Sequence, residues 1–264
     1  MTETSQPELL REDREDGVTR LTLNRPKTFN SLSGSLLRAL DATLDAIAGD
    51  RRIRVVVITG AGGRAFCAGH DLKEMGAERT HDALKALFDR CSRVMLKLTR
   101  IPQPVIARVE GIATAAGCQL VAACDLAICT TDSRFATSGV KYGLFCSTPM
   151  VALSRNIPRK AAMEMLLTGD FIDAAEAHRI GLVNRVVPRE ELDAAVEAMA
   201  ARLLDKPPAV LALGKRAFYA QLETGLEEAY AMTTEVIVDN ALGRDFEEGL
   251  RAFLEKRRPV WVTE

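Results

Sequence analysis

The chain has 264 residues, a net charge of -1 and 47% hydrophobic residues, an ordinary composition for one large globular domain or two small ones. The near-neutral charge argues against a nucleic-acid partner, because neutralising phosphates requires a basic excess. The polar N-terminus lacks the apolar segment of a signal peptide, and no run approaches the roughly 18 apolar residues of a membrane span. We therefore predict a cytoplasmic protein with neither a membrane nor a nucleic-acid partner.

Cysteine and histidine spacing argues against disulfides and against a metal site. The six cysteines form no CxxC pair and several lie in apolar stretches, so we expect reduced, mostly buried thiols. The three histidines, His70, His81 and His178, share no spacing typical of metal ligands.

Apolar patterns along the chain alternate between strand and helix spacing. The first dozen or so residues are polar, and we expect them to be frayed. Strands are expected at residues 18–24, 55–59, 105–109 and 126–130, and helices at residues 31–47, 81–98 and 115–124. From about residue 159 the pattern is almost wholly helical. The sequence thus predicts an α/β body with parallel strands, followed by a helical C-terminal part.

A glycine-rich loop, GAGGRA at residues 60–65, follows the second predicted strand and nominally fits a dinucleotide-binding fingerprint. Its context does not fit, because the next residues, FCAGHD, do not open a helix at once. The loop also lacks the GK[ST] of a phosphate-binding P-loop. A nicotinamide site remains a weakly supported alternative.

Two strand-to-helix junctions are built from small residues. They are AGHDLKEM at residues 68–75 and VEGIATAAG at residues 109–117. Backbone N–H groups at a helix start are unpaired and suit a developing negative oxygen. Two such junctions could supply two amides to one oxygen, as an oxyanion hole for a thioester carbonyl. The alternatives are a plain helix cap by Asp71 and tight helix–sheet packing.

Several motifs occur together in order: LTLNRPKTFNSL, VVVITGAGGRAFCAGHDLKEM, IPQPVIARVEGIATAAGCQLVAACDLAI, RFATSGVKYGLFCSTP, LTGDFIDAAEAHRIGLVNRVVP and AFLEKRRPVW. With these motifs the chain resembles the crotonase (enoyl-CoA hydratase/isomerase) superfamily. The resemblance implies an α/β fold, a ClpP-like spiral of ββα units with a C-terminal helical region that builds trimers, often paired as hexamers. It divides the chain into a flexible N-terminus (1–16), a spiral core (17–200) and a helical trimerisation region (201–264).

The resemblance also implies an acyl-coenzyme A site. The amides of His70 and Ala116 would form the oxyanion hole, and the loop Ala68, Asp71, Leu72 and Lys73 would line the thioester and pantetheine. Further coenzyme contacts would come from Arg25 and Lys27 at the phosphates and adenine, and from Phe253 and Lys256, to the coenzyme of the same or of a neighbouring subunit. An alternative for these residues is surface charge and helix packing. Coenzyme A would be part of the substrate, and no covalently bound cofactor is expected.

The chain departs from the family at both proton-transfer positions. A hydratase has two glutamates, where this chain has Gln119 and Gly139. Glutamine can hold a water or a carbonyl but cannot exchange a proton at useful pH. Candidate substitutes are His70, Asp71, Glu74, Glu110 and Tyr142, and the position of an acid used by some relatives is Ser147. The stretches GCQLVAACD, FCSTP, VDNALGRDFEEG and KRRPVW resemble a subgroup that lacks both glutamates.

Three functions follow from these residues and the resemblance. The first is an acyl-CoA enzyme, formally an enoyl-CoA hydratase of fatty acid metabolism, or a related enolate reaction such as isomerisation, decarboxylation or thioester hydrolysis. The second is a non-catalytic acyl-CoA binding or sensing protein. The third, an RNA-binding side role, is disfavoured by the near-neutral charge. Apolar segments at residues 81–98 and 145–150 predict a hydrophobic rather than a charged acyl group.

Overall fold

The computed structural model describes residues 6–261. Its larger sheet has six strands in the order β1-β2-β3-β5-β7-β10, parallel except for β1. These strands are β1 (Leu9–Asp13), β2 (Val18–Leu23), β3 (Val55–Gly60), β5 (Val105–Val109), β7 (Leu126–Thr130) and β10 (Arg185–Val187). The four strands expected from the sequence, β2, β3, β5 and β7, are confirmed as neighbours in this sheet.

A smaller sheet has the order β4-β6-β8-β9, with β4, β6 and β8 parallel and β9 antiparallel. Its strands are β4 (Ala65–Cys67), β6 (Ile112–Thr114), β8 (Arg134–Ala136) and β9 (Ile172–Asp173). Each of β3, β5 and β7 in the larger sheet is followed by one strand of the smaller sheet and then by helix. This threefold repeat is the spiral of ββα units that the resemblance implied.

Strand β1 corrects the prediction that the first dozen residues are frayed. It pairs antiparallel with β2, with Leu9 opposite Leu23, and the Asn24 amide donates to the Glu8 carbonyl. The sequence of β1, LLRED, has no alternation that separates it from a loop, so pairing with β2 decides its structure. The prediction for residues 1–5 lies outside the described residues.

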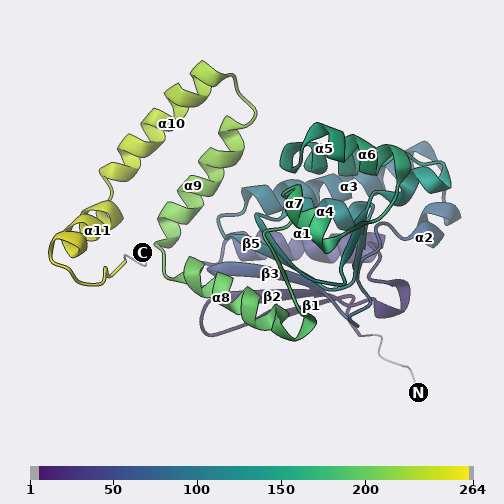
Figure 1. The fold of residues 1–264 in the computed structure, drawn as a ribbon, viewed down its shortest axis with the longest axis horizontal. Helices are drawn as coiled ribbons and strands as arrows, with labels where there is room; N and C mark the ends of the chain where they lie inside the picture. Colours follow the sequence, from purple (N-terminus) through teal and green to yellow (C-terminus); the bar gives the residue numbers. More distant parts are fainter. Residues whose placement is uncertain (1–5, 262–264) are drawn as a thin grey trace.

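Helices cover both faces of the larger sheet (Figure 1). On one face α1 (Gly34–Ala48), α3 (His81–Arg100) and α4 (Ala116–Ala123) pack over one continuous core that includes Leu21, Ile58 and Ala107. On the other face α8 (Leu192–Leu204) covers a second, smaller core. The Ser33 hydroxyl accepts from the Leu36 amide, so Ser33 is the N-cap of α1. All six cysteines are free and buried.

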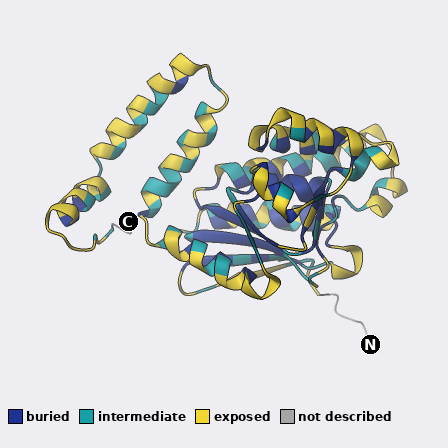
Figure 2. Cartoon of the chain, in the orientation of Figure 1, coloured by how far each residue is buried: buried dark blue, intermediate teal, exposed yellow. Residues whose placement is uncertain are grey.

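The remaining helices are α2 (Leu72–Ala77), α5 (Ser147–Asn156), α6 (Arg159–Thr168), α7 (Ala174–Arg179), α9 (Pro208–Gln221), α10 (Leu226–Ala241) and α11 (Arg244–Leu254). Helices α9, α10 and α11 form an arm that extends away from the body (Figure 1). Much of this arm is exposed (Figure 2). Its exposed residues include large apolar ones such as Phe218, Leu226 and Ile237. Because burying such area is favourable, this arm is suited to packing against other chains.

A buried polar cluster joins the arm to the body. The Lys215 ammonium on α9 contacts the Asp125 carboxylate at 2.7 Å and donates to the carbonyls of Leu98 and Gln103. The Tyr219 hydroxyl donates to the same carboxylate at 2.9 Å. Burial lowers the pKa of Lys215, while the Asp125 charge opposes that shift. This cluster fixes the start of the arm against the ends of α3 and α4.

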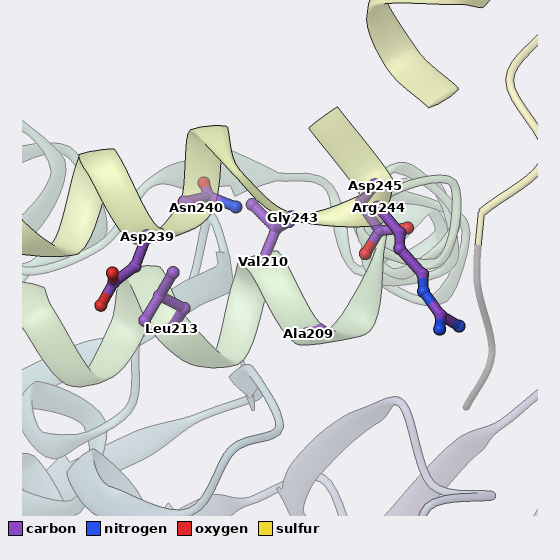
Figure 3. A pocket seen from close by; sticks show the side chains of 8 residues that line it. All are labelled: Ala209, Val210, Leu213, Asp239, Asn240, Gly243, Arg244 and Asp245. Atoms are coloured by element: carbon purple, nitrogen blue, oxygen red, sulfur yellow. The ribbon is translucent and has the colours of Figure 1, made fainter. Parts of the chain in front are cut away.

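A hollow on the arm lies between α9 and the turn from α10 to α11 (Figure 3). It is lined by Ala209, Val210, Leu213, Asp239, Asn240, Gly243, Arg244 and Asp245. The junctions singled out by the sequence lie in the α/β body, so this hollow is separate from them (Figure 1).

Candidate active site

The candidate site lies where β4, β6 and β8 end. These strands are parallel neighbours, so the segments that follow them emerge at one edge of the smaller sheet. Cross-links at this edge tie the segments together: the Ala115 amide donates to the Ala136 carbonyl, and the Thr114 and Ser138 hydroxyls are 2.8 Å apart. The sheet therefore brings together the segments that carry His70, Ala116 and Gly139.

The first two segments are in direct contact. A Cβ placed on Gly69 would lie 2.9 Å from the Ala115 Cβ and 3.2 Å from the Ala116 nitrogen. Gly69 also has a φ of +89°, a backbone conformation that side chains rarely adopt. The amides of His70 and Ala116 make no hydrogen bond to any residue in the described range 6–261. Two unpaired N–H groups thus lie on segments in van der Waals contact.

Helix α4 begins at Ala116 from an unusual backbone. Ala115 has φ 51° and ψ -120°, and it caps the helix without a side-chain hydrogen bond. Such conformations cost roughly 1–3 kcal/mol and persist only where surrounding structure holds them. Gly117 makes the close approach possible, since a Cβ there would lie 2.0 Å from the Cys67 carbonyl. The first turn of α4 is therefore pressed against the end of β4, with its free amides at the junction.

Gln119 lies one turn into α4, three residues after Ala116. Its side chain is 4% exposed, and its Oε1 is buried without a partner among the described residues. Residues three apart share a helix face, and helical side chains lean toward the N-terminus. We therefore expect the Gln119 side chain to lean back toward the turn that carries the Ala116 amide.

The space beside Gly139 is filled by the chain that follows it. Gly139 is the second residue of the segment η2 (Ser138–Tyr142), and a Cβ on it would lie 2.4 Å from the Leu144 carbonyl and 2.8 Å from the Cys146 sulfur. The Leu144 amide donates to the Gly139 carbonyl at 3.0 Å. The chain that follows therefore occupies the space into which a side chain at position 139 would project.

The His70 imidazole is half-buried beside Gly69, and its Nε2 atom is fully buried. Its ring packs edge-on against Phe88 of α3 at 5.1 Å, and its Nε2 has no partner among residues 6–261. Burial lowers the pKa of His70 from its ordinary 6.5 to about 4. The ring is therefore neutral near pH 7, so it can donate or accept a hydrogen bond there without carrying charge.

This burial predicts a pH dependence of stability. Between pH 6.5 and about 4 the unfolded chain protonates His70 while the folded chain does not, so acid favours unfolding. We expect the free energy of unfolding to fall by up to about 1.4 kcal/mol per pH unit below pH 6.5. Urea titrations should show a flatter pH profile for His70→Gln. The control His81→Gln, at an exposed position, should match the wild type; equal profiles for all three proteins would contradict the assignment.

The carboxylates considered as substitutes have structural partners. Asp71 caps α2 through the Lys73 amide and binds Arg25 at 2.9 Å. Glu74 accepts from the Gly34 amide at 2.7 Å. Glu110 pairs with two arginines, Arg108 and Arg189. All three carboxylates therefore have structural partners, and none is left free to act as the acid or base of proton transfer.

The hydroxyl candidates face solvent. Tyr142 is 73% exposed, and Ser147 is exposed at the start of α5. The Ser147 hydroxyl donates weakly to the Phe145 carbonyl at 3.4 Å. The structure does not bury either hydroxyl beside Gln119.

The residues expected to contact coenzyme A fall into four groups. Arg25 is a structural clamp: its guanidinium contacts Glu8 and Asp71 and donates to the Ser31 carbonyl, leaving little of it for a phosphate. Lys27 and Lys73 are exposed, and neither forms an ion pair with a described residue. These two cations remain predicted phosphate contacts.

The other two groups lie on different parts of the chain, one at the start of α2 and one at the end of α11. Leu72 is 60% exposed at the start of α2, beside Ala68 and Asp71 in the loop predicted to line pantetheine. Phe253 is 79% exposed at the end of α11, and Lys256 follows it. Both lie on the arm, away from the junction of their own chain (Figure 1).

Comparison with known proteins decides the family. A family model described as enoyl-CoA hydratase/isomerase matches residues 13–264. The chain belongs to this family. It is similar to enoyl-CoA hydratase domain-containing protein 3, mitochondrial, of Xenopus laevis, with 46% identity over 249 residues that cover 94% of this chain and 84% of that one.

Solved structures of enoyl-CoA hydratase relatives share the fold. A crystal structure of enoyl-CoA hydratase from Mycobacterium smegmatis has a TM-score of 0.95 at 55% identity, covering 97% of this chain and 99% of that one. The crystal structure of human enoyl-CoA hydratase domain-containing protein 3 has a TM-score of 0.92 at 44% identity, covering 97% and 100%. These matches confirm the family and the crotonase fold.

The relatives also correct one prediction. The matched proteins of Xenopus, rat, mouse and human, 44–46% identical, are all named mitochondrial, so the predicted cytoplasmic location is wrong. That prediction rested on the lack of an evident signal peptide or transit peptide in the sequence. Within residues 6–261 no helix is long and apolar enough to cross a membrane. The same residues contain no cluster of side chains suited to a metal ion.

Proposed function

We propose that the protein binds an acyl-coenzyme A thioester and directs its carbonyl oxygen to the amides of His70 and Ala116. The observation that carries this proposal is the contact of Gly69 with Ala115 and Ala116, which joins two unpaired amides at one place. Amides fixed in advance stabilise a developing oxyanion, and each is worth roughly 10² to 10³ in rate. Membership of the enoyl-CoA hydratase/isomerase family supports a thioester as the ligand.

The proposed assembly is a homotrimer or a hexamer built through the arm. Its exposed apolar residues supply a surface for this packing, and the cluster around Lys215 holds the arm in place. Phe253 and Lys256 on the arm would then reach the coenzyme of a neighbouring subunit. Lys27 and Lys73 would lie near the phosphates of the subunit's own coenzyme.

The proposed chemistry is that of an enoyl-CoA hydratase whose proton-transfer groups are missing. Gln119 holds no proton to exchange, and Gly139 is closed off by Leu144. A positioned acid or base contributes about 10² to 10⁴ in rate, so hydration should be feeble. The closure at Gly139 favours a second candidate, a non-catalytic acyl-CoA binding protein that keeps the oxyanion amides.

Calorimetric titration of the full-length protein with butyryl-CoA and with free coenzyme A tests the proposed function. Butyryl-CoA should bind at least about tenfold more tightly, because only the thioester carbonyl reaches the two amides. Gly69→Ala should lose this difference, since its Cβ would press on the Ala116 nitrogen. The control Gly49→Ala, where nothing lies within 4 Å, should keep it. Equal binding of both ligands by the wild type would refute the proposal.

A further inference from the structure

The peptide bond between Gly69 and His70 is held on one side by Leu32. The Gly69 carbonyl accepts from the Leu32 amide at 2.7 Å, and the Asp71 amide donates to the Leu32 carbonyl at 3.2 Å. In a trans peptide, as here, the carbonyl oxygen and the N–H of the next residue point in opposite directions. The His70 N–H therefore points away from Leu32.

The side chain of His70 is held by packing. Asp71, the next residue, is tied to Arg25 by an ion pair, and α2 after it has no buried residue. The His70 Nε2 has no hydrogen-bond partner among residues 6–261, although it is buried. What the ring packs against therefore sets how firmly this part of the loop is fixed.

Phe88 of α3 supplies that packing. The two rings meet edge to face, with centroids 5.1 Å apart and planes at 74°, which is a favoured geometry for an aromatic pair. Phe88 is half-buried and lies three residues before Cys91, on the face of α3 whose residues Cys91, Val94 and Leu98 are fully buried. The support under the His70 ring is thus part of a helix anchored in the core.

We propose that Phe88 is a positioning residue for the oxyanion hole, which acts through the His70 ring to keep the His70 amide directed at the thioester oxygen. This inference rests on the proposed function, because it assumes that the amides of His70 and Ala116 receive that oxygen. Such donors must be held within about 0.5 Å of their productive position. Leu32 fixes the peptide from one side, and Phe88 stops the residue that carries the amide from turning.

Calorimetry of the full-length protein with butyryl-CoA and with free coenzyme A measures the first consequence. Phe88→Ala should reduce the preference for the thioester by about threefold or more, as for one neutral hydrogen bond lost or misaligned. Phe88→Tyr keeps the ring and should keep the wild-type preference. The matched control is Leu87→Ala, which removes apolar bulk from the next residue of α3, packed against the core, and should also keep it.

Nuclear magnetic resonance of histidine-labelled protein without ligand measures the second consequence. Burial holds the pKa of His70 at about 4, and Phe88→Ala would let water reach the ring. The pKa of His70 should then rise toward its ordinary 6.5 in Phe88→Ala and stay low in Leu87→Ala. His81 and His178 are exposed and provide reference signals in each protein.

The inference requires both changes in Phe88→Ala. An unchanged thioester preference would overturn it while the thioester site stands, and so would a reduced preference with an unchanged pKa of His70, because Phe88 would then not act through that ring. An equal loss of preference in Leu87→Ala would show a general effect on α3 and would also overturn it. Should Phe88→Ala not fold, the smaller change Phe88→Leu decides by the same two measurements.

The wild type separates this inference from the proposed function. If butyryl-CoA binds the wild type no more tightly than coenzyme A, the proposed function fails and the role of Phe88 fails with it. If the wild type shows the preference and Phe88→Ala keeps it, only the role of Phe88 is lost.

Discussion

Introducing a glutamate at position 139 is expected to destabilise the protein and not to restore hydratase activity. The Cβ alone would lie 2.4 Å from the Leu144 carbonyl and 2.8 Å from the Cys146 sulfur, closer than real contacts allow. The backbone from Gly139 to Cys146 would have to move, breaking the hydrogen bond from the Leu144 amide. We expect Gly139→Glu to lower the free energy of unfolding by about 3 kcal/mol in urea denaturation.

The control for this variant is Gly49→Glu. Gly49 has an ordinary negative φ at the end of α1, and nothing lies within 4 Å of its Cβ position. That variant should unfold within about 0.5 kcal/mol of the wild type. If Gly139→Glu were as stable as the wild type, or hydrated crotonyl-CoA faster, the chain from Gly139 to Cys146 would have to move aside readily. Its packing against position 139 would then not be needed for stability.

Gln119→Glu is the second change with a large expected effect. Glutamate has nearly the same shape, so it fits the space of Gln119 and adds the proton-accepting group that the wild type lacks. Burial tends to raise a carboxyl pKa, while the N-terminal half of α4 favours the charged form. We expect crotonyl-CoA hydration to rise by roughly 10² over the wild type, at the low end for a positioned base, because no second acid is present.

The control for this gain is Gln119→Met, which should hydrate no faster than the wild type. Steady-state loss of the enoyl absorbance reports the rate in each protein. If Gln119→Glu binds crotonyl-CoA but hydrates it no faster than Gln119→Met, then position 119 does not face the reacting carbons, and the geometry inferred for α4 is wrong.

Much of the larger sheet was predictable because most of its strands have an apolar, β-branched or alternating sequence that is typical of a strand. The run at residues 55–59 is buried and β-branched throughout, so its composition and its short length identify it as a buried strand. Helices α1 and α3 likewise follow from apolar spacing. Strand β1 was missed, since its sequence becomes a strand only by pairing with β2.

The smaller sheet was not predictable, although it assembles the site. Strands β4, β6 and β8 have three residues each, too few for any alternation to be seen. The two small-residue junctions lie in contact, since a Cβ on Gly69 would lie 3.2 Å from the Ala116 nitrogen, and the oxyanion role of their amides stays a prediction. No pattern in the sequence predicts that the space beside Gly139 is filled, because this depends on where the chain from Leu144 to Cys146 packs in the folded protein.

The measurement that tests the central claim most directly is crotonyl-CoA hydration by the wild-type protein, in a sample shown by calorimetry to bind the compound. If the protein keeps its oxyanion amides but lacks both proton-transfer groups, turnover should fall well below the usual enzyme range of about 1 to 10³ per second. Turnover within that range would contradict the account and would require an acid or base among the groups assigned structural roles here.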